Sequence, residues 1–141
     1  MQISSKIYHE ILHTFPAVPP EAGGIIGTHG GVVSAFCYDP GFADMDRAVY
    51  TPDIQRLNRV IEGWNADGIR FCGILHTHPD GQTSLSGGDL VYIRRILEAI
   101  PDGAEGLYFP LVFPGRRMVV YHVRLVRSEL VIRRDGVILT E

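Results

Sequence analysis

The segment 69–75 constrains the fold of this chain most, because it is almost purely apolar and lies between two stretches with helical periodicity. Its length and apolar density are typical of a central strand covered on both faces, and its only charged residue is Arg70. Apolar residues three and four positions apart in 51–68 and 86–100 predict an amphipathic helix on either side of this strand. The pattern therefore predicts an α/β fold in which helices pack against a sheet.

Both helices have recognisable borders. Thr51 places a capping hydroxyl directly before Pro52, a residue favoured at the first helical position. Gly68 marks the end of this helix, because glycine readily adopts the left-handed conformation of a helix C-terminus. The second helix is expected to run from about residue 86 to residue 100, where Pro101 stops it.

The rest of the chain adds one more helix and several strands. The first helix is expected to be capped by Ser4 or Ser5 and to end at Pro16. Two strands follow, joined by a turn at 28–30 in which glycine supplies the positive φ angle. These two strands are expected at 22–27 and 31–38. Three more strands are expected near the C-terminus, at 106–113, 117–127 and 130–139. We find no repeat and no linker, so we expect one domain, residues 1–141, with a mixed sheet flanked by helices.

Composition narrows the classes of function. A chain that is 45% apolar and 21% charged is typical of a water-soluble protein with one hydrophobic core. The net charge of −3 gives no electrostatic reason to expect nucleic acid as the main partner. No apolar run approaches the roughly 20 residues that cross a bilayer, and the first residues lack the pattern of a secretion signal. We therefore expect a cytoplasmic protein that does not bind membranes.

The two cysteines, Cys37 and Cys72, lie in apolar, strand-like segments and form no CxxC pair. This placement favours two buried, reduced thiols, with a disulfide or a redox pair as the alternative.

The sequence His76-Thr77-His78-Pro79 carries the strongest chemical signal. Side chains two residues apart on a strand point to the same face, with their Cα atoms about 7 Å apart. Two imidazoles at this separation can bind one ion at about 2.0–2.1 Å from each nitrogen. Pro79 ends the strand, so the pair lies where a ligand can enter. The alternative is two unrelated histidines at the end of a strand.

Asp89, at the start of the third helix, is a candidate third ligand. Two histidines and one aspartate would leave a coordination position open for water, as in catalytic zinc sites. The pattern Ser86-x-x-Asp89 also resembles a capping box, in which both residues serve only the helix end. The two interpretations are compatible, because a cap fixes the backbone that presents Asp89.

These residues resemble the JAMM motif of MPN-domain metalloproteases. The motif is carried by His76-x-His78, ten intervening residues and Asp89, with Ser86 three positions before the aspartate. The family also has a glutamate after the first helix and just before a strand, and Glu21 occupies that place. The predicted order of elements matches the family's core domain over essentially the whole chain. The resemblance implies a small, prokaryotic-type, single-domain member with the family's cytidine-deaminase-like three-layer fold.

The resemblance also implies a reaction. His76, His78 and Asp89 would hold Zn²⁺, Glu21 would act as general base, and the Ser86 hydroxyl would donate a hydrogen bond to the oxyanion. The implied reaction is hydrolysis of an amide or isopeptide bond after the C-terminal tail of a ubiquitin-like or sulfur-carrier protein. Amide cleavage that trims peptides or phage proteins is the alternative substrate class. One departure is Leu85, where many members have proline before the motif serine.

The resemblance also implies where the substrate binds. The substrate tail is expected in a groove between the metal-binding loop and residues 39–50, pairing with a strand edge near Gly23 to Gly27 or lying along the second helix.

The alternative function is a non-catalytic MPN scaffold that binds other proteins. Such relatives generally lack part of the metal-binding set, whereas this chain lacks none of it. A nucleic-acid factor with a related motif is disfavoured by the acidic balance of charge.

Overall fold

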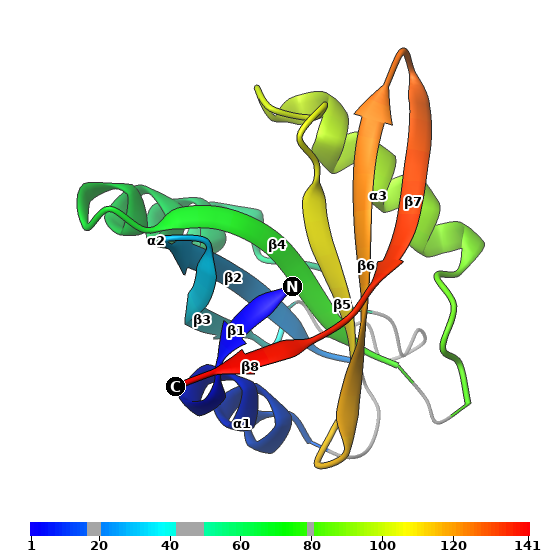
Figure 1. The fold of residues 1–141 in the computed structure, drawn as a ribbon. Helices are drawn as coiled ribbons and strands as arrows, with labels where there is room; N and C mark the ends of the chain where they lie inside the picture. The colour runs from blue at the N-terminus through cyan, green and yellow to red at the C-terminus, as the bar shows by residue number, and fades with distance from the viewer. Residues whose placement is uncertain (17–20, 42–49, 79–80) are drawn as a thin grey trace.

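A mixed β-sheet organises the chain, in the strand order β7-β6-β5-β4-β2-β3-β1-β8 (Figure 1). The computed structural model describes residues 1–16, 21–41, 50–78 and 81–141. The helices are α1 (Ser5–Thr14), α2 (Ile54–Ala66) and α3 (Gly87–Ala99). The strands are β1 (Gln2–Ser4), β2 (Gly23–His29), β3 (Val32–Asp39), β4 (Arg70–Thr77), β5 (Leu107–Phe113), β6 (Arg117–Val126), β7 (Glu129–Asp135) and β8 (Ile138–Thr140).

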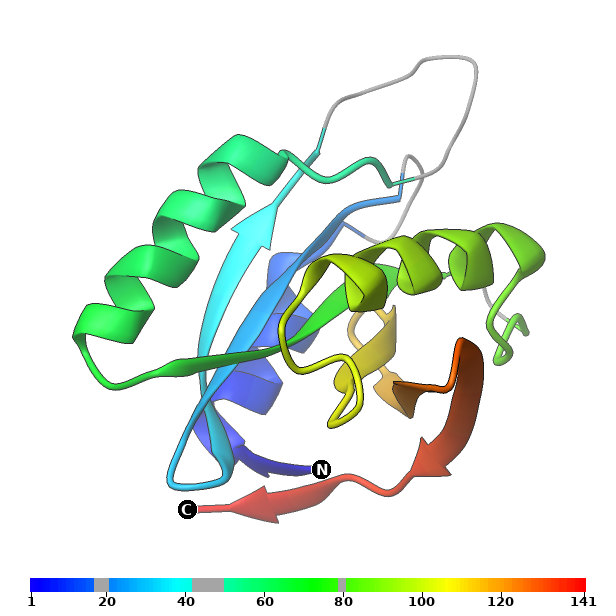
Figure 2. The same cartoon turned by 90° about the horizontal axis from the view of Figure 1, so that it is seen from above.

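The sheet separates the buried apolar side chains into those of its two faces, because successive side chains along its strands point to opposite faces. Ile26 and Leu75 pack with α1 on one face, whereas Ile25 and Ile74 pack with α2 and α3 on the other. Figure 2 shows β2 and β4 running between α1 and α3. The expected α/β architecture with a mixed sheet between helical layers is confirmed.

Strand β4 lies in the middle of the sheet. It pairs antiparallel with β2 and parallel with β5, and α3 forms the connection between β4 and β5. Its residues from Gly73 to Thr77 are buried, as predicted from the apolar run. A parallel pair needs a crossover connection, so the chain must leave the C-terminal end of β4 and return along α3.

The prediction of one continuous strand over residues 130–139 is wrong. The chain forms β7, breaks at Gly136 and Val137, and then forms β8. β7 pairs with β6 and β8 pairs with β1, so these two neighbouring strands lie at opposite edges of the sheet. Only a strongly curled sheet allows this, and Figure 1 shows the C-terminal strand crossing toward β1. The strand β1 was not predicted, because three residues are too few to show a period.

The helix borders match the predictions with one exception. Ser4 caps α1, and its Oγ accepts from the Ile7 N–H at 3.2 Å. The expected cap at Thr51 is wrong, since Asp53 caps α2 by accepting from the Arg56 N–H at 3.3 Å. Aspartate is at least as good a cap as threonine, and the turn before α2 places it closer to the helix. No helix among the described residues is long and apolar enough to cross a membrane.

Both cysteines are free thiols. Cys37 packs in the core beneath α2 and α3, whereas Cys72 packs in the core beneath α1. Because the two side chains lie on opposite faces of the sheet, they cannot form a disulfide with each other. Each is half-buried rather than fully buried, which corrects that part of the expectation. Burial raises the pKa of the Cys72 thiol to about 12, so this thiol is protonated at neutral pH.

We predict opposite effects for alanine at two glycines. A Cβ at Gly73 would lie 2.3 Å from the Tyr108 carbonyl oxygen on β5, whereas a Cβ at Gly63 in α2 has no neighbour within 4 Å. Gly73→Ala should lower the free energy of unfolding by about 1–3 kcal/mol, because β4 and β5 must separate. Gly63→Ala should raise it by roughly 0.5–1 kcal/mol through helix propensity. Urea denaturation measures both, and a neutral Gly73→Ala would contradict the close packing of the two strands.

Candidate metal centre

The two histidines lie at the C-terminal end of β4. His76 pairs with Gly23 on β2 and Leu111 on β5, and the His78 N–H donates to the Val112 carbonyl at 3.1 Å. The alternation of β4 places both imidazoles on the face that carries α3. Both side chains are buried, with 3% and 7% of their surface exposed.

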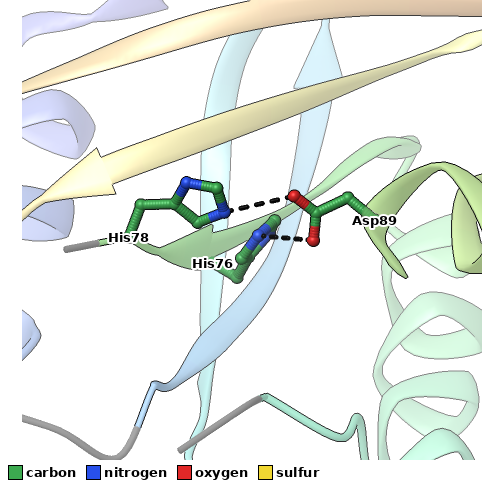
Figure 3. A group of neighbouring side chains, drawn as sticks. All are labelled: His76, His78 and Asp89. Carbon is green, nitrogen blue, oxygen red and sulfur yellow. Dashed lines mark hydrogen bonds and ion pairs between the residues drawn. The ribbon is translucent and has the colours of Figure 1, made fainter. Parts of the chain in front are cut away.

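Asp89 reaches the histidines from the first turn of α3. The Ser86 Oγ accepts from the Asp89 N–H at 3.1 Å, and the Asp89 carboxylate accepts from the Ser86 N–H at 2.8 Å. The same carboxylate lies 3.2 Å from Nε2 of His76 and 3.2 Å from Nε2 of His78 (Figure 3). Both interpretations of this aspartate therefore hold, since the capping box aims Asp89 at the histidines.

The protonation of the imidazoles bears on what the cluster can bind. The His78 Nδ1 lies 2.9 Å from the Gln82 carbonyl, which can only accept, so Nδ1 carries a proton and Nε2 is the nitrogen that can bind a metal ion when the ring is neutral. In the described part of the chain, neither ring nitrogen of His76 has an aligned hydrogen-bond partner, although its Nε2 is close to the carboxylate. A buried polar atom without a partner costs free energy that a bound group can recover.

The residues of this cluster fit a divalent metal ion. One ligand atom from each of His76, His78 and Asp89 can be chosen so that all lie within 4.8 Å of one another. Two imidazole nitrogens and a carboxylate oxygen suit zinc, and the carbonyl behind His78 orients that ligand. The three residues therefore form a candidate metal site with a position left for another ligand.

The charges of the cluster are strongly coupled. Burial alone would raise the pKa of Asp89, but His76, His78 and the Ser86 N–H outweigh burial and hold this pKa well below its usual range. Burial alone would lower the pKa of His78, but Asp89 and the Gln82 carbonyl outweigh it and raise this pKa. The carboxylate is therefore ionised and available as a ligand at neutral pH.

Glu21 lies beside the candidate metal ligands, although it precedes His76 by 55 residues in the chain. The neighbouring Ala22 makes two hydrogen bonds to Thr77 of β4, since the Thr77 N–H donates to the Ala22 carbonyl at 2.9 Å and the Ala22 N–H donates to the Thr77 hydroxyl at 3.0 Å. Burial raises the pKa of the Glu21 carboxyl, and the nearby His76 and His78 oppose that shift. A carboxylate with a raised pKa is suited to proton transfer near neutral pH.

One cavity of about 240 Å³ brings these groups together. Four of the five predicted site residues line it, and the fifth, His78, is joined to it through Asp89. A larger cavity, of about 770 Å³, lies between α2 and the C-terminal part of α3 and contains none of them. Size alone would therefore point away from the polar cluster. The smaller cavity is lined by Glu21, Tyr50, His76, Ser86, Gly88, Asp89 and Tyr92.

Two tyrosines of this cavity were not predicted. The Tyr92 hydroxyl is buried and has no hydrogen-bond partner among the described residues. Tyr92 lies three residues after Asp89 on α3, so helical periodicity could have placed it on the same face. Tyr50 carries no comparable signal, because it reaches the cavity from the segment that precedes α2.

The expected strand edge for the substrate tail near Gly23 to Gly27 is wrong. These residues form β2, which is hydrogen-bonded to β3 on one side and to β4 on the other. Because both sides of β2 are paired, no backbone groups are left there for an added strand. Most of the expected groove segment 39–50, namely 42–49, lies outside the described residues.

Comparison with known proteins shows similarity of structure only. Neither a family model nor a curated protein matches this sequence. A solved protein from Desulfitobacterium hafniense matches with a TM-score of 0.63 and 18% identity, over 99% of this chain and 92% of its own. A protein from Salinibacter ruber matches with a TM-score of 0.56 and 18% identity, over 100% and 92%. A JAB1/MPN domain protein from Archaeoglobus fulgidus matches with a TM-score of 0.52 and 17% identity, over the whole of both chains.

The chain therefore has the fold of a JAB1/MPN domain protein, as its motif residues suggested. The similarity covers the full chain, so it is not confined to one part of the domain. At this level of identity the comparison establishes the fold, and the chemistry has to be argued from the residues in the cavity.

We predict that two histidines of the metal-free protein titrate on opposite sides of the ordinary pKa of 6.5. The pKa of His78 should be higher, because Asp89 and the Gln82 carbonyl outweigh the effect of burial. The pKa of His122 should be lower, because of burial and the nearby Arg133. Asp89→Asn should lower the pKa of His78 and leave that of His122 unchanged. NMR titration of the ring protons measures all of these values, and an unchanged His78 in the variant would contradict the contact.

Proposed function

We propose that this protein is a zinc-dependent hydrolase of amide bonds. The observation that supports the proposal is the meeting of His76, His78 and Asp89 with Glu21 around one small cavity. A ligand set of this composition beside a carboxylate with a raised pKa is the arrangement of catalytic zinc sites. A purely structural metal site would need no proton acceptor in the same cavity.

The residues of the cavity have distinct roles in this proposal. Zinc, when bound, acts as a Lewis acid that lowers the pKa of water from 15.7 to about 7. Glu21 takes the proton of the attacking water and delivers it to the leaving amine. The Ser86 Oγ already accepts from the Asp89 N–H, so its own proton is free to be donated to the oxyanion.

We further propose that the substrate is the C-terminal tail of a ubiquitin-like or sulfur-carrier protein, joined through an amide to lysine or to another peptide. A cavity of about 240 Å³ suits a tail of small residues better than a bulky side chain. Because β2 has no free edge, we place the tail against Tyr50 and the first turn of α3, which line the cavity. A cytoplasmic location stays a prediction from the sequence.

A non-catalytic scaffold is the alternative function. A structure in which one of the three metal-ligand residues is missing, or points away from the other two, would support the scaffold. Here the three ligand residues converge and Glu21 lines the same cavity, so the arrangement favours catalysis.

The first prediction concerns zinc. The purified chain should bind about one zinc ion, and Asp89→Ala should lose it, because two histidines alone hold zinc poorly. Asp102→Ala is the matched control, since this aspartate is 61% exposed and pairs with Arg70 away from the cavity. Elemental analysis after dialysis measures the zinc content. A folded wild-type chain that takes up no zinc would overturn the catalytic proposal and favour the scaffold.

The second prediction concerns the chemistry. Glu21→Gln should keep its zinc and lose nearly all activity, because the amide cannot accept the proton. Ser86→Ala should lower kcat by about 10²–10³ through loss of an oxyanion donor. Its lost helix cap should also cost about 1 kcal/mol of stability.

These variants need a substrate panel. Ubiquitin-like and sulfur-carrier proteins with a peptide or lysine joined to the C-terminal glycine are incubated with the zinc-loaded chain, and mass spectrometry reads the cleaved products. Cleavage by Glu21→Gln at the wild-type rate would rule out Glu21 as the base.

A further inference from the structure

Asp39, the last residue of β3, is a buried carboxylate that accepts hydrogen bonds from four donors among the described residues. Only 1% of its surface is exposed. It accepts from the Tyr50 hydroxyl at 2.7 Å, the Asp53 N–H at 3.0 Å, the Gly41 N–H at 3.1 Å and the Arg56 guanidinium at 3.4 Å. A buried charge persists only when it is hydrogen-bonded in this way, so Asp39 ties the end of β3 to Tyr50 and to the start of α2.

The Tyr50 ring lies directly against backbone. A Cβ at Gly23 would lie 2.3 Å from a carbon of this ring, and a Cβ at Gly41 would lie 3.0 Å from another. Gly23 is the residue that pairs with His76 across β2 and β4. The two glycines therefore leave the space in which the ring rests, beside the end of β4 that carries the histidines.

Tyr50 also contacts the proposed base. Its side chain lines the cavity with Glu21 and His76, and its backbone N–H acts as a hydrogen-bond donor that lowers the pKa of the Glu21 carboxyl. One residue thus joins two carboxylates, with its hydroxyl bound to buried Asp39 and its N–H bound to Glu21. Any movement of the Tyr50 backbone would move the hydrogen bond that orients Glu21.

We propose that Asp39 and Tyr50 are positioning residues, which hold the Glu21 carboxylate in its place in the cavity through the Tyr50 backbone. This inference rests on the proposed function for its effect on catalysis. Asp39 does not line the cavity and acts only through Tyr50. The pair fixes the segment directly before α2, whose Asp53 N–H is bound by the same carboxylate.

Tyr50→Phe is the sharpest test, because it removes only the hydroxyl and keeps the ring that fits against Gly23. The zinc-loaded variant should keep its zinc and its KM, whereas kcat should fall by roughly 10-fold to 100-fold, as expected when a catalytic group loses its orientation. Asp39→Asn should show the same pattern with a smaller fall. Tyr108→Phe is the matched control, because it removes a half-buried tyrosine hydroxyl on the opposite face of the sheet and should leave kcat unchanged.

A second readout needs no substrate. In Glu21→Ala, amide hydrogen exchange at Tyr50 should be at least 10-fold faster than in the wild type, because the N–H has lost its acceptor. Exchange at Tyr108 in the same variant should not change. A wild-type protein without activity would overturn the proposed function but not the contact between Tyr50 and Glu21. Hydrogen exchange of the Tyr50 amide tests that contact without any substrate.

Two results would overturn the positioning role. One is wild-type kcat in Tyr50→Phe, and the other is unchanged exchange of the Tyr50 amide in Glu21→Ala. A rise in KM with kcat unchanged would also overturn it, because the hydroxyl would then contact the substrate and not orient the base.

Discussion

The central position of β4 is the constraint on which the rest of this structure depends. Its parallel neighbour, β5, can be reached only through a crossover, and the chain supplies α3 for that purpose. The crossover begins where β4 ends, so the first turn of α3 must lie near His76 and His78. Asp89 is in that first turn, and the reciprocal hydrogen bonds with Ser86 set its direction. The three candidate metal ligands are therefore brought together by the same connection that builds the sheet.

The other side of the cavity depends on β2 and β3. Hydrogen bonds between Ala22 and Thr77 fix the backbone next to Glu21 at the end of β4. Asp39, at the end of β3, gathers the donors of the segment before α2. Each strand end in this region thus supplies one group to the cavity or fixes a residue that does.

Two residues that line the cavity have buried polar atoms without hydrogen-bond partners in the described ranges, as expected of a site that binds a ligand. The ring nitrogens of His76 and the hydroxyl of Tyr92 are buried without hydrogen-bond partners among the described residues. Asp39 is buried to a similar degree, yet four donors in the described part of the chain bond to it. The contrast separates a carboxylate that stabilises the fold from groups that are left available for a ligand.

The sequence by itself determined the strand and the helix that carry the candidate metal ligands, and it indicated those ligands. The apolar period of β4, the capping pattern of Ser86 and Asp89 and the spacing of the two histidines are local signals, because each depends on neighbours within a few residues. The tertiary structure alone decided the curl of the sheet, the break at Gly136 and the pairing of β1 with β8. It also decided that β2 is paired on both sides and that Tyr50 contacts Glu21. These features join residues far apart in the chain, and no local pattern encodes the partner that a strand or a tyrosine will meet.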